Sequence, residues 1–253
     1  MKISGNTVLI TGGATGIGLA IAEEFVKAGS EVIVCARTEE RLKQAKDRLP
    51  SLHTRRCDIS KEAEREALYE WAVTSFKDLN LLVDKAGIQR MIDFRKGTAD
   101  LLKHRAEDGE DEIEVNLRAL VYMTALFTPH LMNQKEAANI NVSSGLAFYP
   151  MASLPVYCAT KAAVHTFSLT LRQQLGGTPV KVFEFILPMV DTNLDKGARR
   201  ARGQTYFGIT TTEFVIPAMK SFRNDGYEIR VQGPNLDAMR GNSQGGPFQD
   251  RKI

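Results

Sequence analysis

The stretch Thr11-Gly12-Gly13-Ala14-Thr15-Gly16-Ile17-Gly18 decides the fold class of this chain because of what flanks it. A β-branched apolar run at residues 7–10 precedes it, and residues 16–28 carry apolar side chains at helical spacing. Glycine lets such a loop turn tightly against a phosphate, and a helix N-terminus favours an anion. The stretch therefore predicts a nucleotide-binding loop between a strand and a helix, with a ligand-free glycine turn as the alternative. No Gly-Lys-Ser/Thr follows, which excludes a P-loop.

Strand-like and helix-like segments alternate along the rest of the chain. Further strands are expected at residues 31–36, 52–57, 79–83, 138–143, 180–187 and 228–231, and helices at 38–48, 60–76, 108–133 and 155–175. Apolar strands alternating with helices predict an α/β fold, a doubly wound (Rossmann) parallel sheet of about seven strands with helices on both faces in three αβα layers.

The domain organisation follows from this alternation. We expect a single domain over residues 1–253, with an irregular stretch at 88–106, a substrate lid at about 193–215 and a tail at 241–253. The tail is either mobile or ordered by a partner subunit.

The composition excludes several classes of protein. The chain has 253 residues, of which 43% are hydrophobic and 25% charged, as in ordinary globular proteins. Its net charge of +3 is spread without a basic block, which argues against nucleic acid as a partner. The apolar run at 182–190 is far shorter than the ~20 residues of a membrane span. Three cysteines without a CxxC pair (Cys35, Cys57 and Cys158), together with no signal peptide, predict free thiols in the cytoplasm, and no metal site is predicted.

Tyr157 and Lys161 lie four residues apart on a predicted helix and therefore on one face of it. Ser144 follows the predicted fifth strand, at the edge where a sheet of this type binds ligands. A lysine ammonium lowers the pKa of a neighbouring phenol, and a serine hydroxyl can hold a carbonyl oxygen as charge develops. These residues predict an acid–base site, with a surface Tyr–Lys contact and a capping serine pair as the alternative.

The end of the predicted second strand bears on the kind of nucleotide. It reads Cys35-Ala36-Arg37, without the carboxylate that would bind the ribose 2′-hydroxyl of NAD. The Arg37 guanidinium could instead pair with a 2′-phosphate. The sequence therefore favours NADP(H) over NAD(H), with a plain surface arginine as the alternative.

Taken together, these motifs resemble the classical short-chain dehydrogenase/reductase family over residues 5–235. The glycine loop matches Thr-Gly-x-x-x-Gly-x-Gly, and Tyr157 and Lys161 match the family's Tyr-x-x-x-Lys. The family's spacing to the tyrosine favours Ser144 over Ser143 as the active-site serine. Residues 156–165 with 191–194 are most similar to the DltE-like branch.

The resemblance implies an NAD(P)-dependent oxidoreductase that interconverts a carbonyl and an alcohol of a small molecule, as a homodimer or homotetramer. Tyr157 would be the acid–base, Lys161 would lower its pKa and hold the nicotinamide ribose, Ser144 would orient the substrate oxygen, and Asn116 would support a proton-relay water. The residues implied in cofactor binding are Thr11, Gly12, Gly16, Ile17, Gly18, Arg37, Asp58, Gly87, Tyr157, Lys161, Val190 and Thr192. The alternative is a nucleotide-binding sensor or scaffold with little catalysis.

Two departures from the family's pattern bear on this implication. Asp84-Lys85-Ala86-Gly87 stands where the family has Asn-Asn-Ala-Gly, and Pro188 replaces a glycine after the sixth strand. The Asp84 and Lys85 side chains could pair with each other, or with Asp58, or could weaken cofactor binding. His165, which follows Lys161 by one helical turn, is expected to pack rather than to act as a second base.

Overall fold

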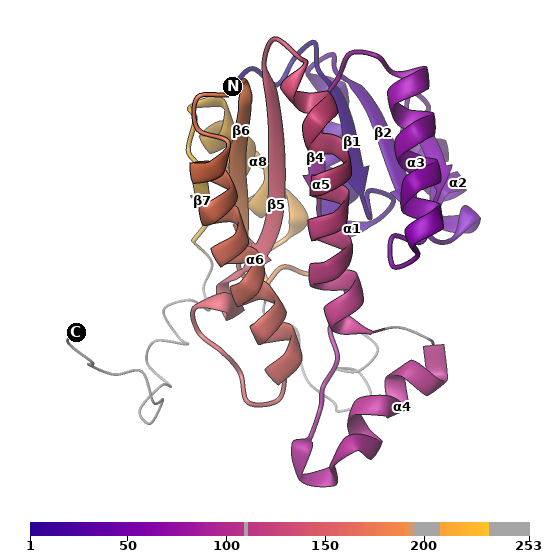
Figure 1. Cartoon of the computed structure of the whole chain (residues 1–253), viewed down its shortest axis with the longest axis vertical. Helices are drawn as coiled ribbons and strands as arrows, with labels where there is room; N and C mark the ends of the chain where they lie inside the picture. The colour runs from indigo at the N-terminus through magenta and orange to yellow at the C-terminus, as the bar shows by residue number, and fades with distance from the viewer. Residues whose placement is uncertain (109–110, 193, 195–207, 233–253) are drawn as a thin grey trace, which may run out of the picture.

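The computed structural model describes residues 1–108, 111–192, 194 and 208–232. Its centre is a seven-stranded sheet in the order β3-β2-β1-β4-β5-β6-β7, and every neighbouring pair of strands is parallel (Figure 1). The strands are β1 (Thr7–Thr11), β2 (Glu31–Ala36), β3 (His53–Arg56), β4 (Leu79–Asp84), β5 (Ala137–Ser144), β6 (Val180–Leu187) and β7 (Glu228–Arg230). The predicted doubly wound parallel sheet is confirmed.

Helices cover both faces of the sheet. They are α1 (Gly16–Lys27), α2 (Glu39–Arg48), α3 (Glu62–Ser75), α4 (Thr98–Asp108), α5 (Ala119–Met132), α6 (Pro155–Gln174) and α8 (Thr211–Arg223). Apolar side chains of α1, α2 and α8 share one core cluster, and those of α3, α5 and α6 share the other. The helices α3, α5 and α6 stand in front of the sheet in Figure 1.

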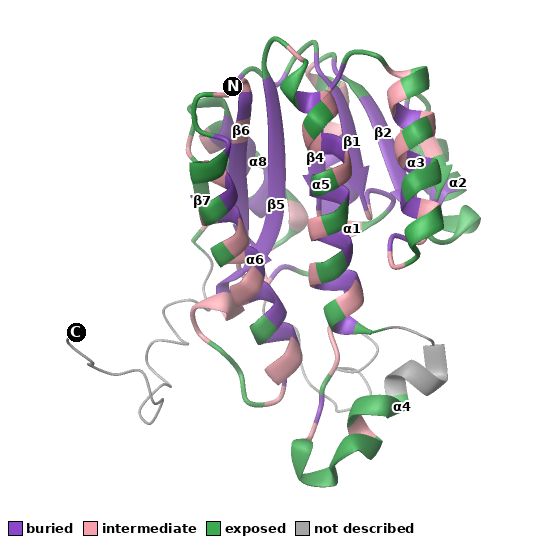
Figure 2. Ribbon diagram, viewed as in Figure 1, coloured by how far each residue is buried: buried purple, intermediate pink, exposed green. Residues whose placement is uncertain are grey.

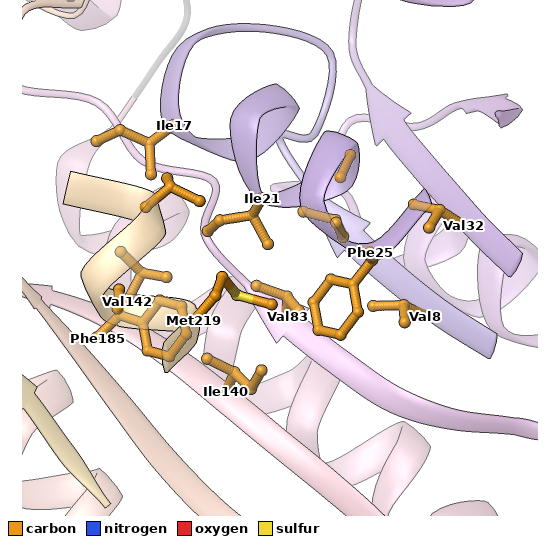
Figure 3. Packing of buried hydrophobic residues seen from close by; sticks show 14 of the residues in the cluster. Val8, Ile17, Ile21, Phe25, Val32, Val83, Ile140, Val142, Phe185 and Met219 are labelled. Atoms are coloured by element: carbon orange, nitrogen blue, oxygen red, sulfur yellow. The ribbon is translucent and has the colours of Figure 1, made fainter. Parts of the chain in front are cut away.

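The strands are apolar on both sides because each side faces a layer of helices. Along β1, Val8 and Ile10 belong to one cluster and Leu9 to the other, as expected from the two-residue alternation of a strand. The sheet is accordingly buried throughout its centre, whereas the outward faces of the helices are exposed (Figure 2). In the first cluster, Ile21 and Phe25 of α1 meet strand residues and α8 (Figure 3). This two-sided burial fixes the helices around the sheet and leaves the strand ends free for a site.

Two stretches differ from the sequence-based expectation. The stretch 88–106, expected to be irregular, contains a short 3₁₀ turn at Phe94–Lys96 and most of α4, which lies beyond the carboxyl ends of the strands (Figure 1). The helix expected over residues 108–133 begins with a π-helical segment, Glu114–Arg118, before α5, and Pro129 lies within α5.

Helix α8 was not among the expected elements. Its start is defined by a capping box: the Thr210 hydroxyl accepts the Glu213 N–H at 3.1 Å, and Glu213 Oε2 accepts the Thr210 N–H at 2.7 Å. Residues 211–215, which were expected in the lid, therefore belong to the N-terminal part of α8. Most of the expected lid and the tail at 241–253 lie outside the described residues.

In the part of the chain that the structure describes, no helix is long and apolar enough to cross a membrane. Cys35, Cys57 and Cys158 are buried and unpaired.

The packing of α8 generates a stability prediction. The buried Phe222 ring lies 4.6 Å from the Phe183 ring and 6.2 Å from the Phe25 ring, measured between centroids. Phe222→Ala should lower the free energy of unfolding by about 3–5 kcal/mol, since it leaves a cavity between α8 and the sheet. Denaturant titration measures this change. Ile216→Ala, on the exposed side of the same helix, should change it by less than about 0.5 kcal/mol, and equal losses would contradict the packing described.

Candidate active site

The predicted site residues gather where the strand order reverses. Thr11 at the end of β1 is level with Cys35 in β2 on one side and Asp84 in β4 on the other. The carboxyl ends of these strands therefore meet at one edge, and the connections from β1 and β4 leave in opposite directions. Open α/β sheets bind ligands at this switch point.

The glycine loop is shaped by close backbone approaches. Gly12 and Gly16 have φ angles of +64° and +55°, which favour glycine. A Cβ at Gly12 would lie 3.0 Å from Ala86 Cα, and one at Gly18 would collide with the Gly12 carbonyl. The first turn of α1 contains no acidic residue, and Thr15 makes no side-chain capping bond. The N-terminal N–H groups of α1 are thus available for an anion such as a phosphate.

Thr11 ties this loop to the segment after β4. Its Oγ1 accepts the main-chain N–H groups of Lys85 at 3.0 Å and of Ala86 at 3.2 Å, and donates to the Val83 carbonyl at 3.3 Å. Gly87 follows in the same segment, two residues after Lys85. A Cβ at Gly87 would lie 3.1 Å from Asn116 Oδ1 and 3.6 Å from Lys161 Nζ. The Gly87 backbone therefore lies between the glycine loop and the predicted acid–base residues.

The structure brings Ser144, Tyr157 and Lys161 to the neighbouring ends of β5 and α6. Lys161 Nζ lies 5.7 Å from the centre of the Tyr157 ring and donates to the Val142 carbonyl at 2.9 Å. Ser144 ends β5, and its Oγ accepts the Leu146 N–H at 3.2 Å. Burial, together with the charge of nearby Lys85, lowers the pKa of Lys161 to about 8, which the Glu184 carboxylate opposes. A cation beside a phenol is the arrangement that makes tyrosine an acid–base group near neutral pH.

Asn116 lies in the π-helical segment before α5. Its Oδ1 accepts the Ile88 N–H at 2.7 Å, and its Nδ2 donates to the Ile88 carbonyl at 2.8 Å. The same Nδ2 lies 3.3 Å from the Thr160 hydroxyl on α6. Asn116 therefore links the segment after β4 to the helix that carries Tyr157, and π-helical turns are frequent at functional sites.

Of the remaining predicted cofactor residues, Thr192 lies against the glycine loop. A Cβ at Gly16 would lie 3.5 Å from Thr192 Cγ2, and Val190 forms a bridge with Ile209. Arg37 follows β2 and is exposed, while Asp58 follows β3 and its Oδ1 accepts the Ser60 hydroxyl at 2.7 Å. Thr192 and the glycine loop are thus in contact, and Arg37 and Asp58 lie along the outer strands of the same edge.

Neither ion pair considered for Lys85 is present among the described residues. The Asp84 carboxylate points away, and its Oδ2 lies 3.3 Å from the Thr124 hydroxyl and 3.4 Å from Asn139 Nδ2. Its Oδ1 has no hydrogen-bond partner, and burial raises the pKa of Asp84 to about 8. Asp84 is thus held against α5 and β5, whereas Lys85, the first residue after β4, is held by its main-chain N–H at Thr11.

A buried Glu184 on β6 was missed by the sequence analysis. Its carboxylate accepts a hydrogen bond from the Ser143 hydroxyl, and its Oε2 lies 2.8 Å from His165 Nδ1. The His165 ring packs edge-on against Phe148, with centroids 4.6 Å apart. Ser143 is therefore held by Glu184, and His165 serves packing and this contact. The missed signal was a lone carboxylate inside the apolar run of β6, because such a residue must find partners when buried.

Comparisons with known proteins agree with this geometry. The family model for short chain dehydrogenases matches residues 6–203. The uncharacterized oxidoreductase DltE of Bacillus subtilis is 53% identical over 236 residues, which are 92% of each chain. The NADP-dependent 3-hydroxy acid dehydrogenase YdfG of Salmonella typhi is 36% identical, over 84% of this chain and 86% of the relative. A serine dehydrogenase solved with NADP+ superposes with a TM-score of 0.76 at 29% identity, over 88% of this chain and 92% of that one.

A parallel doubly wound sheet with a glycine loop at its switch point and a Tyr–Lys pair beside it defines a dinucleotide-binding oxidoreductase fold. The chain belongs to the short-chain dehydrogenase/reductase family, and its similarity to DltE agrees with the branch that the sequence resembles.

The Glu184 cluster generates a prediction about stability. Glu184→Ala should lower the free energy of unfolding by about 3 kcal/mol, since the Ser143 hydroxyl and the His165 ring lose a buried partner. Chemical denaturation measures the loss. The matched control is Glu228→Ala, which removes the residue paired with Glu184 across β6 and β7 but breaks only ion pairs that are at least partly exposed. The control should lower the free energy of unfolding by less than about 1 kcal/mol, and a similar loss in both variants would contradict the buried cluster.

The raised pKa of Asp84 generates a pH prediction. The folded protein holds the Asp84 proton up to about pH 8, whereas an unfolded chain releases it near 3.8, so the folded state loses stability as the pH rises between these values. Asp84→Asn removes the charge and offers an amide donor to the unpartnered Asn139 or Asn141 oxygen. The variant should gain more than about 1.4 kcal/mol at pH 8, the equivalent of one pKa unit, and less near pH 4.

Unfolding titrations at pH 4, 6 and 8 measure this gain. Asp47→Asn, at an exposed position on α2, is the control and should show no such pH dependence. If Asp84→Asn raised the free energy of unfolding by the same amount at all three pH values, the Asp84 carboxyl of the folded protein would be ionised over this whole range.

Proposed function

We propose that this chain is an NADP(H)-preferring oxidoreductase that interconverts a carbonyl and an alcohol of a small molecule. The observation that carries the proposal is the meeting of Tyr157, Lys161 and Ser144 with the glycine loop at one edge of the sheet. Family membership supports the reaction class, and the relatives with named cofactors support the use of a dinucleotide.

The residues at this edge of the sheet fit a dinucleotide. The glycine loop leaves the N-terminus of α1 open to a phosphate, and Gly87 leaves space where a Cβ would press on Asn116. In the proposal, Thr11, Gly12, Gly16, Ile17, Gly18, Asp58, Gly87, Val190 and Thr192 line this cofactor site. When bound, the nicotinamide ring supplies or accepts the hydride.

The protein's own residues move the proton and hold the substrate. In reduction, the Tyr157 phenol donates its proton to the oxygen of the carbonyl group, and in oxidation the phenolate takes the proton from the alcohol. The Lys161 ammonium lowers the pKa of Tyr157 and binds the nicotinamide ribose. The Ser144 hydroxyl donates a hydrogen bond to the substrate oxygen as negative charge develops there. Asn116 holds the Ile88 segment and supports the water that returns a proton to the Tyr157–Lys161 pair.

The preference for NADP(H) rests on Arg37. It follows β2, at the position where a carboxylate would bind the 2′-hydroxyl of NAD, and its guanidinium suits a phosphate. The relatives YdfG and serine dehydrogenase, which are named for NADP or solved with it, support the same preference.

We also propose a homodimer or homotetramer in the cytoplasm. Exposed apolar side chains of Ile113, Tyr122 and Met132 on and before α5 support an interface on that helix. The three unpaired cysteines support a reducing compartment.

Tyr157→Phe tests the proposed reaction. It removes only the hydroxyl, so the Kd for NADPH should stay within about twofold, while turnover should fall by at least about 10²-fold. NADPH fluorescence measures binding, and NADPH oxidation with a panel of ketones, sugars and acyl thioesters measures turnover. The control is Tyr69→Phe on α3, where the ring packs on Phe127 and turnover should be unchanged. Undiminished turnover in Tyr157→Phe would refute the role of Tyr157, and NADPH binding without any turnover in the unaltered protein would favour a sensor or scaffold.

A further inference from the structure

Lys85 emerges from the sheet beside the residues proposed to bind the cofactor. It is the first residue after β4, and its N–H is held by Thr11 at the end of β1. Arg37 leaves the same edge one residue after the end of β2, on the other side of β1. Since neighbouring strands are about 4.8 Å apart, the two main chains lie roughly 10 Å from each other, a span that two long side chains can close from opposite sides of a phosphate.

The charged groups around the Lys85 ammonium are cations. Burial, together with the charge of Arg41 on α2, lowers the pKa of Lys85 to about 8, and Lys85 in turn lowers the pKa of Lys161 on α6. The adjacent Asp84 carboxylate is directed to Thr124 and Asn139 instead. Among the described residues, no carboxylate forms an ion pair with Lys85, and Asp58 binds Ser60 and Lys61.

A half-buried ammonium beside another cation, with no carboxylate paired to it among the described residues, favours an anion from outside the chain. Taking such a charge out of water is costly unless a partner of opposite charge sits beside it. Lys161 lies on α6, beside β5 and β6, whereas Arg41, the cation whose charge lowers the pKa of Lys85, lies on α2, which begins just after Arg37 on the β2–α2 side. That side is the adenosine side of a doubly wound fold, whereas the pyrophosphate belongs at the N-terminus of α1.

We propose that Lys85 binds the 2′-phosphate of an adenosine dinucleotide together with Arg37 and Arg41, and so determines the preference for the phosphorylated cofactor. The inference rests on the proposed function, because it requires that the cleft takes a dinucleotide. It also explains why a lysine stands where the family has an asparagine: an amide supplies no charge to a phosphate dianion.

Binding of cofactor fragments tests the proposal without any turnover. Lys85→Asn should weaken the Kd for 2′,5′-ADP and for NADPH by about tenfold, and change the Kd for 5′-ADP and NADH by less than twofold. Isothermal titration calorimetry measures all four. The matched control is Lys135→Asn, which removes the same charge from an exposed position just before β5, at the opposite edge of the sheet, and should leave every Kd unchanged.

The pH dependence provides a second readout. A phosphate beside Lys85 stabilises its charged form, so its pKa should rise above about 8 on binding and the complex should take up a proton near pH 8.5. The 2′-phosphate is already a dianion there, and 2′,5′-ADP lacks the nicotinamide half that lies toward Lys161. Titrations at pH 8.5 in two buffers of different ionisation heat should show proton uptake in the unaltered protein and markedly less in Lys85→Asn.

The outcomes separate this inference from the proposed function. If the unaltered protein binds 2′,5′-ADP tightly and Lys85→Asn binds it equally well, the inference is wrong while the dinucleotide site stands. An equal weakening for 2′,5′-ADP and 5′-ADP also overturns it, since the ammonium would then act on another phosphate. If the unaltered protein binds none of the four ligands, the proposed function fails as well. Lys85→Met, which keeps the length of the side chain, gives the same comparison should the asparagine variant not fold.

Discussion

The hydroxyl of Thr11 is the interaction on which the candidate site depends. It accepts the two N–H groups that follow β4 and donates to the last apolar residue of that strand, so it joins the ends of β1 and β4 where no strand pairing continues. Because of this junction, Ala86 packs against Gly12 and the Gly87 backbone reaches Asn116 and Lys161. Open α/β sheets bind ligands where the connections of neighbouring strands diverge in this way, and Thr11 fixes the main chain at that point.

A buried polar layer between the sheet and α6 complements this junction. Lys161, His165 and Ser168 of α6 face the Val142 carbonyl, Glu184 and Asn141, and each pair is within hydrogen-bonding distance. Such groups are costly to bury unless they are paired, and the pairs can form only when α6 lies at one position over β5 and β6. The layer therefore holds Tyr157 in place through its helix, and the Glu184 carboxylate supports the charge of Lys161.

The sheet, most of its strands and the main site residues could be predicted because their signals are local. A strand that must be apolar on both faces is visible as a run such as that of β6, whose bounds the sequence predicts to the residue. The glycine loop needs positive φ angles at Gly12 and Gly16, so its residue types reveal its shape. Helix α8 has an equally local capping box at Thr210, but Pro217 within it argues against a helix. The π-helical turn at Asn116 depends on partners distant in the sequence, so no local pattern shows it. Glu184 is visible as a lone carboxylate in an apolar run, but no local pattern shows that its partners are Ser143 and His165.

The sequence by itself determined the fold class, the family and the placing of a tyrosine–lysine pair on one helix and of a glycine loop after the first strand, because periodicity and short motifs encode them. Only the tertiary structure decided the direction of the two charges that replace the family's asparagines. Asp84 faces α5 and burial raises its pKa to about 8, while burial and the charge of Arg41 lower the pKa of Lys85. The reason is physical: the electrostatic environment of a side chain depends on which face of the strand it occupies and on residues brought there from distant parts of the chain.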